Sequence, residues 1–227
     1  MLKIVSVHSF VYLVCIDWPL KMKQKISDKI IGRLTLYHSI LQNFAEKDID
    51  IITSPQIAFL LNIDDSQVRK DLNCLNNTGK SRVGYFVKDL IKSIEKTLGI
   101  SKTKNAVIIG AGNLGKALAK YDNFESYGLH VVSLFDNDKE KIGSTFENKN
   151  IYDIEKLKEK VTEENIEIAI LTVPWVSAQE VANLISETKI KYIWNFTPKV
   201  LKPVTGIHIL NENLMGNLLQ FTHKVMG

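Results

Sequence analysis

The chain has 227 residues, enough for two small domains, and its 45% hydrophobic and 24% charged residues exclude bulk disorder. Its only cysteines are Cys15 and Cys74, and its five histidines are scattered, so we expect neither a disulfide framework nor a metal site. The formal net charge of +4 is concentrated in residues 22–104, but on charge alone ordinary surface solvation is the simpler explanation.

The first 21 residues differ in character from the rest of the chain. Their apolar stretch, from Val5 to Ile16, is too short to span a bilayer, and no small-residue cleavage site follows it. A polar sequence opens at Met22. We therefore expect residues 1–21 to be an extension without function, Met22 to be the natural start, and the protein to be cytoplasmic and not bound to a membrane.

The next segment has the pattern of a helix-turn-helix. Apolar residues recur every three or four positions over residues 26–46, which predicts an amphipathic helix. Thr53-Ser54-Pro55-Gln56 has the residue types of a capping box, so a short helix is expected to follow it through Leu61. A second helix is expected to begin at Asp64 after a tight turn.

A basic β-wing is predicted after this second helix. The sequence Asn76-Asn77-Thr78-Gly79 breaks the helical pattern, and residues 80–85 add Lys80 and Arg82 next to Gly84. A linking helix is then expected over residues 87–98, ending at Gly99.

From Asn105 onward, apolar strand-like runs alternate with helical stretches. This alternation predicts a parallel, doubly wound sheet of the Rossmann type. The expected strands are 106–109, 130–135, 168–173, one within 190–196 and one near 207–210, and the expected helices are 113–120, 155–161, 178–187 and a terminal helix from about Glu212.

A glycine-rich turn carries the strongest chemical signal. The sequence Gly110-Ala111-Gly112-Asn113-Leu114-Gly115 follows an apolar strand and opens a helix, which is the context that binding of a dinucleotide pyrophosphate requires. Asp136 ends the next strand, where a carboxylate accepts hydrogen bonds from ribose hydroxyls and disfavours a 2′-phosphate. These features predict an NAD(H) site, although Asp138 could supply the carboxylate instead, or both residues could merely cap a turn.

The sequence shows no positioned acid or base for hydride transfer, so we expect a ligand sensor rather than an enzyme, with no catalytic residues. The alternative is a Rossmann-fold NAD(H)- or CoA-binding enzyme or ligand-binding protein that does not bind DNA. On the helix from Asp64, the apolar residues point inward. Gln67, Arg69, Lys70 and Asn73 are then available to a DNA major groove, unless this face is simply solvated.

Taken together, these stretches resemble the Rex family of redox-sensing transcriptional repressors over residues 25–225. The stretches that match are Arg33-Leu-x-Leu-Tyr37, Gln67-Val-Arg-Lys-Asp-Leu72, Gly79-Lys80, Val83-Gly-Tyr85, Gly110 to Gly115, Ala117-Leu-x-x-Tyr121, Phe135-Asp136, Leu171-Thr-Val-Pro174, Ala178-Gln179 and Asn195-Phe-x-Pro198.

The resemblance implies a homodimer that exchanges its C-terminal helix and releases operator DNA when NADH binds, with NAD⁺ competing. It implies DNA contacts by Arg69, Lys70 and the wing's Lys80, and we expect Arg82 and Tyr85 of the predicted wing to contact DNA as well. It implies nucleotide contacts by the glycine turn and Asp136, with Thr172, Val173, Pro174 and Asn195 near the nucleotide and Tyr121 close to the nicotinamide.

Two family features are absent. Ser39 stands where the family commonly has an arginine, and Asn213 where it commonly has an aspartate, so both charges of a relay to the tyrosine at position 121 are missing. The wing also carries Asn76 and Ser81 in place of the usual residues.

The predicted fold is therefore α/β, with an N-terminal winged helix-turn-helix domain, a Rossmann domain and a C-terminal domain-swapped helix. The expected boundaries are 1–21 for the extension, 22–99 for DNA binding, 100–210 for NAD(H) and 211–227 for dimerisation.

Overall fold

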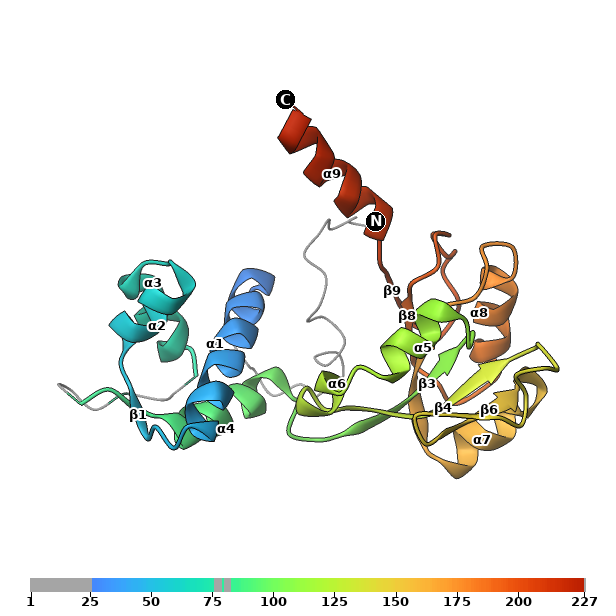
Figure 1. Ribbon diagram of the computed structural model, residues 1–227, viewed down its shortest axis with the longest axis horizontal. Coiled ribbons are helices and arrows are strands. Elements are labelled where there is room, and N and C mark those ends of the chain that lie inside the picture. The colour runs from blue at the N-terminus through green and yellow to red at the C-terminus, as the bar shows by residue number, and fades with distance from the viewer. Residues whose placement is uncertain (1–25, 76–78, 80–82, 227) are drawn as a thin grey trace. The chain divides into compact units, whose positions relative to one another are not determined.

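The computed structural model describes residues 26–75, 79 and 83–226, and its labelled elements can be followed in Figure 1. The predicted wing residues Lys80 and Arg82 lie outside the described residues. The chain divides into two compact units, residues 1–102 and 103–227. No helix in the described part of the chain has the length and apolar character needed to cross a membrane.

The first unit contains the expected helix-turn-helix. Thr53 and Gln56 form the predicted capping box, because each side chain bonds the backbone N–H of the other. Asn62 makes the turn in the left-handed conformation, with φ of 52°. The elements of this unit are α1 (Asp28–Glu46), β1 (Ile51–Ile52), α2 (Ser54–Leu61), α3 (Asp65–Asn73), β2 (Tyr85–Phe86) and α4 (Val87–Leu98).

Helix α4 covers the predicted residues and ends because Gly99 adopts a φ of 75°. The structure adds a pairing that the sequence did not reveal. Strand β1 pairs with β2 in antiparallel register, Ile51 opposite Phe86, so the residues after the wing return to the segment before α2. A core of fully buried side chains joins the helices, and includes Leu34, Tyr37, Leu41, Ile57, Val68, Leu72, Leu90 and Ile94.

The second unit is a seven-stranded sheet in the order β5-β6-β4-β3-β7-β8-β9, parallel except for the β5–β6 pair. The strand order reverses at β3, as a doubly wound fold requires. The strands are β3 (Lys104–Ile109), β4 (Leu129–Asp136), β5 (Thr145–Phe146), β6 (Lys149–Asp153), β7 (Ile166–Leu171), β8 (Tyr192–Asn195) and β9 (His208–Asn211).

Helices cover both faces of this sheet. Helices α7 and α8 pack on the face formed by Val107, Ile109 and Leu171, whereas α5 contacts β3 and β4 with Gly115 against Ile108 on the opposite face. The helical segments are α5 (Asn113–Ala119), α6 (Asn123–Ser126), the 3₁₀ turn η2 (Ile154–Lys156), α7 (Leu157–Glu163), α8 (Ala178–Ser186) and α9 (Leu214–Met226).

Three elements of the second unit were not predicted: α6 and the two strands of the β5–β6 hairpin. All are short, and the hairpin's turn uses Glu147 and Asn148 with positive φ rather than a glycine. The sequence alone therefore gave too weak a signal for them. The predicted helix at 155–161 begins as a 3₁₀ turn and becomes α-helical at Leu157.

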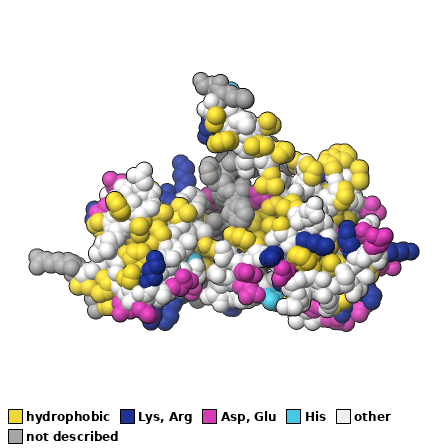
Figure 2. Space-filling model, viewed as in Figure 1, with side chains coloured by type: hydrophobic (Ala, Val, Ile, Leu, Met, Phe, Trp, Pro, Cys, Tyr) yellow, Lys and Arg dark blue, Asp and Glu magenta, His cyan; other side chains and the backbone are white. Residues whose placement is uncertain are grey.

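The terminal helix α9 begins at Leu214, two residues later than predicted, because Asn213 caps it by accepting a hydrogen bond from the Gly216 N–H (2.8 Å). Apolar side chains gather on this helix (Figure 2), and those exposed in the single chain are Leu214, Met215, Leu218, Leu219, Phe221 and Val225. An apolar surface of this size is typical of a partner-binding helix.

The glycine turn and the residues just after β7 pass very close to each other. Gly110 has a φ of 106°, and a Cβ at this position would lie 2.8 Å from the carbonyl group of Thr172. A Cβ at Gly115 would collide with the Gly110 carbonyl oxygen and lie 2.9 Å from Thr172 Oγ1. At Gly112, by contrast, a Cβ would meet nothing within 4 Å. Two glycines of the motif are therefore required for packing and the third is not.

This difference predicts unequal effects of the same substitution. Gly115→Ala should lower the free energy of unfolding by about 2 kcal/mol or more, because backbone atoms would have to move. Gly112→Ala should cost less than about 1 kcal/mol, since only a helix cap changes. Denaturant unfolding followed by tryptophan fluorescence measures both, because Trp175 and Trp194 lie in this unit. Equal losses in the two variants would contradict the packing argument.

Candidate functional site

Asp136 is held at the end of β4 by the glycine turn. Its Oδ2 accepts hydrogen bonds from the Ala111 N–H (2.8 Å) and from Lys141 Nζ (3.2 Å), and its Oδ1 accepts one from the Asp138 N–H (2.9 Å). Burial alone would raise the pKa of Asp136. The hydrogen bonds from the two backbone groups and Lys141 outweigh burial and lower it. The carboxyl group is therefore ionised at neutral pH.

An open pocket of about 1050 Å³ lies where the carboxyl ends of β3, β4 and β7 meet. This is the position at which open α/β sheets bind their ligands. Of the predicted nucleotide-binding residues, those that line the pocket are Gly110, Gly112, Asp136, Thr172, Val173 and Pro174; Ala111, Asn113, Leu114, Gly115, Tyr121 and Asn195 do not.

Apart from Asp138, which the sequence analysis named as an alternative carboxylate, helix α8 and the turn after β4 contribute lining residues that the sequence analysis missed. The turn supplies Asp138 and Lys141, the start of η2 supplies Ile154, and the α8 region supplies Ser177, Glu180, Val181, Asn183, Leu184 and Glu187. The α8 residues recur at three- and four-residue spacing, so they share one helix face. That periodicity was visible in the sequence, but nothing in it identified which face would border the pocket.

Thr172 and Asn195 both have structural hydrogen bonds. Thr172 Oγ1 donates to the Gly110 carbonyl (2.8 Å) and so joins β7 to the glycine turn. Asn195 is fully buried; its Nδ2 donates to the Lys199 carbonyl and to Asn211 Oδ1, and its Oδ1 accepts from the Thr197 N–H. The Asn195 amide thus fixes the loop after β8, and its predicted nucleotide contact stays a prediction.

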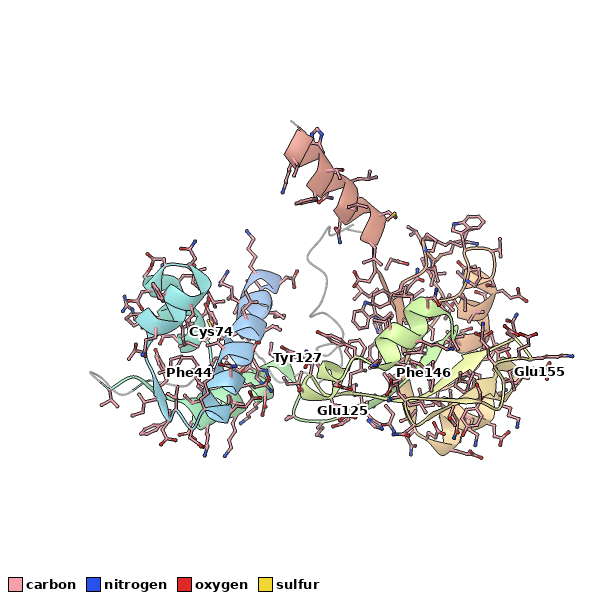
Figure 3. All side chains as sticks on the ribbon, viewed as in Figure 1. Phe44, Cys74, Glu125, Tyr127, Phe146 and Glu155 are labelled. Carbon is pink, nitrogen blue, oxygen red and sulfur yellow. The ribbon has the colours of Figure 1, made fainter. Side chains whose placement is uncertain are left out.

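Tyr121 lies after α5, outside the pocket. Its side chain is about half exposed, and its ring meets the Phe124 ring edge-on at 5.0 Å. The last turn of α5 faces the β5–β6 hairpin, because Lys116 Nζ lies 5.5 Å from the centre of the Phe146 ring, labelled in Figure 3.

In the first unit, the predicted DNA-binding side chains of α3 differ in whether they are free to reach a ligand. Arg69, Lys70 and Asn73 are exposed, and Arg69 Nη1 pairs with Asp65 Oδ2 at 2.6 Å. Gln67 is different: its Nε2 donates to Asp71 Oδ1 (2.9 Å), so its amide is turned back along the helix. The i,i+4 spacing of this pair was visible in the sequence.

Helix α3 is tied to α1 by the buried carboxylate of Asp71, which is 1% exposed. Arg33 binds it in a bidentate manner, Nε to Oδ2 (2.5 Å) and Nη2 to Oδ1 (2.8 Å), and the Tyr37 hydroxyl donates to Oδ2 (2.8 Å). With Gln67, four donors fill the roughly four acceptor positions of one carboxylate. The exposed face of α3 is thereby fixed relative to α1.

Tyr85 is half-buried in β2, and burial raises the pKa of its hydroxyl. A Cβ at Gly79 would lie 2.8 Å from the Tyr85 ring, so these two residues on either side of the wing are close together. The role of Tyr85 in DNA contact stays a prediction.

Comparisons with known proteins agree with this division into two sites. Residues 25–73 match the family model of a putative DNA-binding protein N-terminus, and residues 101–199 match the CoA binding domain model. The chain is 38% identical to the redox-sensing transcriptional repressor Rex of Clostridium perfringens, over 90% of this chain and 96% of that protein. It is 39% identical to Rex of Carboxydothermus hydrogenoformans, over 88% and 97%.

Solved structures of a Rex-family repressor are also similar to this chain. The Rex-family repressor RSP in complex with β-NAD⁺ and operator DNA is 33% identical, with a TM-score of 0.80 over 89% of this chain and 94% of that one. RSP in complex with β-NADH is also 33% identical, with a TM-score of 0.74 over 89% and 95%.

The Asp71 network predicts that removing the charge of Asp71 destabilises the protein much more than removing the charge of Asp65 on the same helix. Asp71→Asn should reduce the free energy of unfolding by about 3 kcal/mol, because it leaves the part-buried Arg33 without its charged partner. Asp65→Asn, which breaks the i,i+4 pair of the part-exposed Asp65 with the exposed Arg69 on the same helix, should cost below about 1 kcal/mol. Denaturant unfolding monitored by circular dichroism compares them, and similar losses would refute the special role of Asp71.

The Asp71 network also predicts how the free energy of unfolding depends on pH. Burial alone would raise the pKa of Asp71, but the bonds from Arg33, Tyr37 and Gln67 together lower it below the ordinary 3.8. The stabilisation is therefore complete above pH 3.8 and is lost as the pH falls through the lowered pKa of the folded state. The stability difference between the parent and Asp71→Asn should shrink over that acidic range.

Proposed function

Because the chain belongs to the Rex family of redox-sensing transcriptional repressors, we propose that it binds operator DNA through α3 and the wing and releases it when NADH binds the second unit. In this proposal the protein is a cytoplasmic homodimer joined through α9, and residues 22–99, 100–210 and 211–227 bind DNA, bind NAD(H) and dimerise, respectively. The protein is a repressor and not an enzyme, so the alternative of a Rossmann enzyme is less well supported.

One observation carries the proposal: the pocket joins Gly110, Gly112 and Asp136 at the carboxyl edge of the sheet. At Gly112 the backbone is open to a close approach by a pyrophosphate, since a Cβ there would meet nothing within 4 Å. Asp136 is ionised and suited to ribose hydroxyls. RSP, which shares this fold, binds β-NADH and β-NAD⁺.

The DNA-binding part of the proposal is supported by the exposed cations of α3. Arg69 and Lys70 are exposed, while Val68, Asp71 and Leu72 are buried against the rest of the unit. A helix whose inner face is fixed and whose outer face is basic is suited to a major groove. The exposed apolar residues of α9 support dimerisation, because a second copy would remove them from water.

The DNA hypothesis predicts a change in salt dependence. Arg69→Ala and Lys70→Ala should each reduce the slope of log K against log salt by about one if the side chain contacts a phosphate, or relax sequence specificity if it contacts a base. Lys92→Ala removes the same charge from the exposed surface of α4 and serves as the matched control. Fluorescence anisotropy with duplex DNA measures this. Variants that bind like the parent at every salt concentration would rule out the α3 contact.

The missing charges at Ser39 and Asn213 predict that NADH binding is coupled to DNA release more weakly than the family's charged relay implies. Both residues are exposed, and Asn213 already caps α9, a role that aspartate also fills. A charged hydrogen bond contributes roughly 1.5–3 kcal/mol and a neutral one roughly 0.5–1.5 kcal/mol. The double change Ser39→Arg with Asn213→Asp should therefore increase the NADH-dependent loss of operator affinity by about fivefold, for about 1 kcal/mol of added coupling.

Gel-shift titrations with operator fragments selected from the source genome, with and without saturating NADH, test the proposal. The parent should release DNA with NADH, and Gly112→Val should bind DNA but fail to respond, because the side chain blocks the pyrophosphate. A parent that binds DNA equally with and without NADH would overturn the proposed function. An unchanged response in the double variant would show that coupling uses other contacts.

A further inference from the structure

The pocket contains a lysine, Lys141, that lies between two carboxylates in the turn after β4, where the ribose of a bound nucleotide is expected. Lys141 Nζ lies 3.2 Å from Asp136 Oδ2 and 3.3 Å from Asp138 Oδ2. Its backbone N–H bonds the Asp138 carbonyl (3.0 Å), which fixes the start of the side chain beside both acids. Lys141 is the only cationic residue among the described lining residues, whereas four are acidic: Asp136, Asp138, Glu180 and Glu187.

The Lys141 ammonium occupies part of the surface that a ribose would use. Three donors already bond Asp136: the Ala111 N–H and Lys141 on Oδ2, and the Asp138 N–H on Oδ1. Since a carboxylate has about four acceptor positions, two ribose hydroxyls cannot both donate to Asp136 until Lys141 moves. The two backbone donors are fixed by the fold, but Lys141 has a flexible side chain that is about one-third exposed.

We propose that Lys141 is a specificity-determining residue that weakens the rejection of a ribose 2′-phosphate, so that NADPH is a second, weaker ligand of this pocket. The inference rests on the proposed nucleotide site. When a ribose displaces the ammonium from Asp136, the lysine still lies beside the ribose. It then faces either the 2′-hydroxyl of NADH or the 2′-phosphate of NADPH.

Charge counting gives the direction of the effect. With Lys141 in place, the group formed with Asp136 and Asp138 carries a net charge of −1, whereas without it the charge is −2. Repulsion of a 2′-phosphate therefore rises sharply when the lysine is removed, while the neutral hydroxyl of NADH is little affected. The hydrogen bond to Asp136 raises the pKa of Lys141, so the ammonium stays charged at neutral pH.

The test is calorimetric titration of the full-length protein with NADH and with NADPH. Lys141→Met should increase the ratio of the NADPH Kd to the NADH Kd by on the order of tenfold, chiefly by weakening NADPH. The increase should shrink at high salt, because the pocket is open and its charges are screened. Lys141→Arg keeps the charge and should leave the ratio within about threefold of the parent.

Lys139→Met is the matched control, because it removes a lysine from the same turn that is exposed and does not line the pocket. Its ratio should stay within about twofold of the parent. The inference is overturned if Lys141→Met keeps the parental ratio or if Lys139→Met changes it equally. A parent that binds NADH but shows the same ratio in every variant refutes only this inference, whereas a parent that binds no NADH removes the nucleotide site as well.

Discussion

The glycine turn is packed so closely against Thr172, just after β7, and against its own backbone that two of its three glycines have no room for a side chain. This contact, completed by the hydrogen bond from Thr172 Oγ1 to the Gly110 carbonyl, brings the carboxyl ends of β3 and β7 together. The Ala111 N–H then reaches Asp136 at the end of β4. The pocket exists because three strand ends meet there, so its geometry depends on a packing constraint rather than on the nucleotide.

Each unit is organised around one buried aspartate, but the two carboxylates differ in how completely they are used. Asp71 accepts four hydrogen bonds within the first unit, including a bidentate pair with Arg33, and this arrangement is suited to holding α3 rigidly. Asp136 accepts two bonds from fixed backbone groups and one from a flexible lysine. The partners of Asp71 are all groups of the first unit held in or beside its core, whereas one of the three partners of Asp136 is a flexible, part-exposed lysine.

Residues that belong to the same expected site also differ in whether their side chains are used within the fold or are open to a ligand. Thr172 and Asn195 both stand at strand ends, yet Thr172 lines the pocket whereas the Asn195 amide is used within the loop after β8. Gln67 and Arg69 both lie on α3, yet Gln67 bonds the buried Asp71 and Arg69 is exposed. Residues of one motif can thus have different surroundings, one lining the pocket or exposed and another hydrogen-bonded within the fold.

The sequence by itself determined the features that depend on neighbours in the chain: the capping box at Thr53, the end of α4 at Gly99, the strand–glycine–helix turn and the alternation that builds the parallel sheet. These follow from backbone conformations and periodicities that a few adjacent residues fix. Only the tertiary structure decided that Arg33 meets Asp71, 38 residues away, and that one face of α8 borders the pocket. Such contacts depend on how whole elements pack, and packing joins side chains whose separation in the sequence carries no local signal.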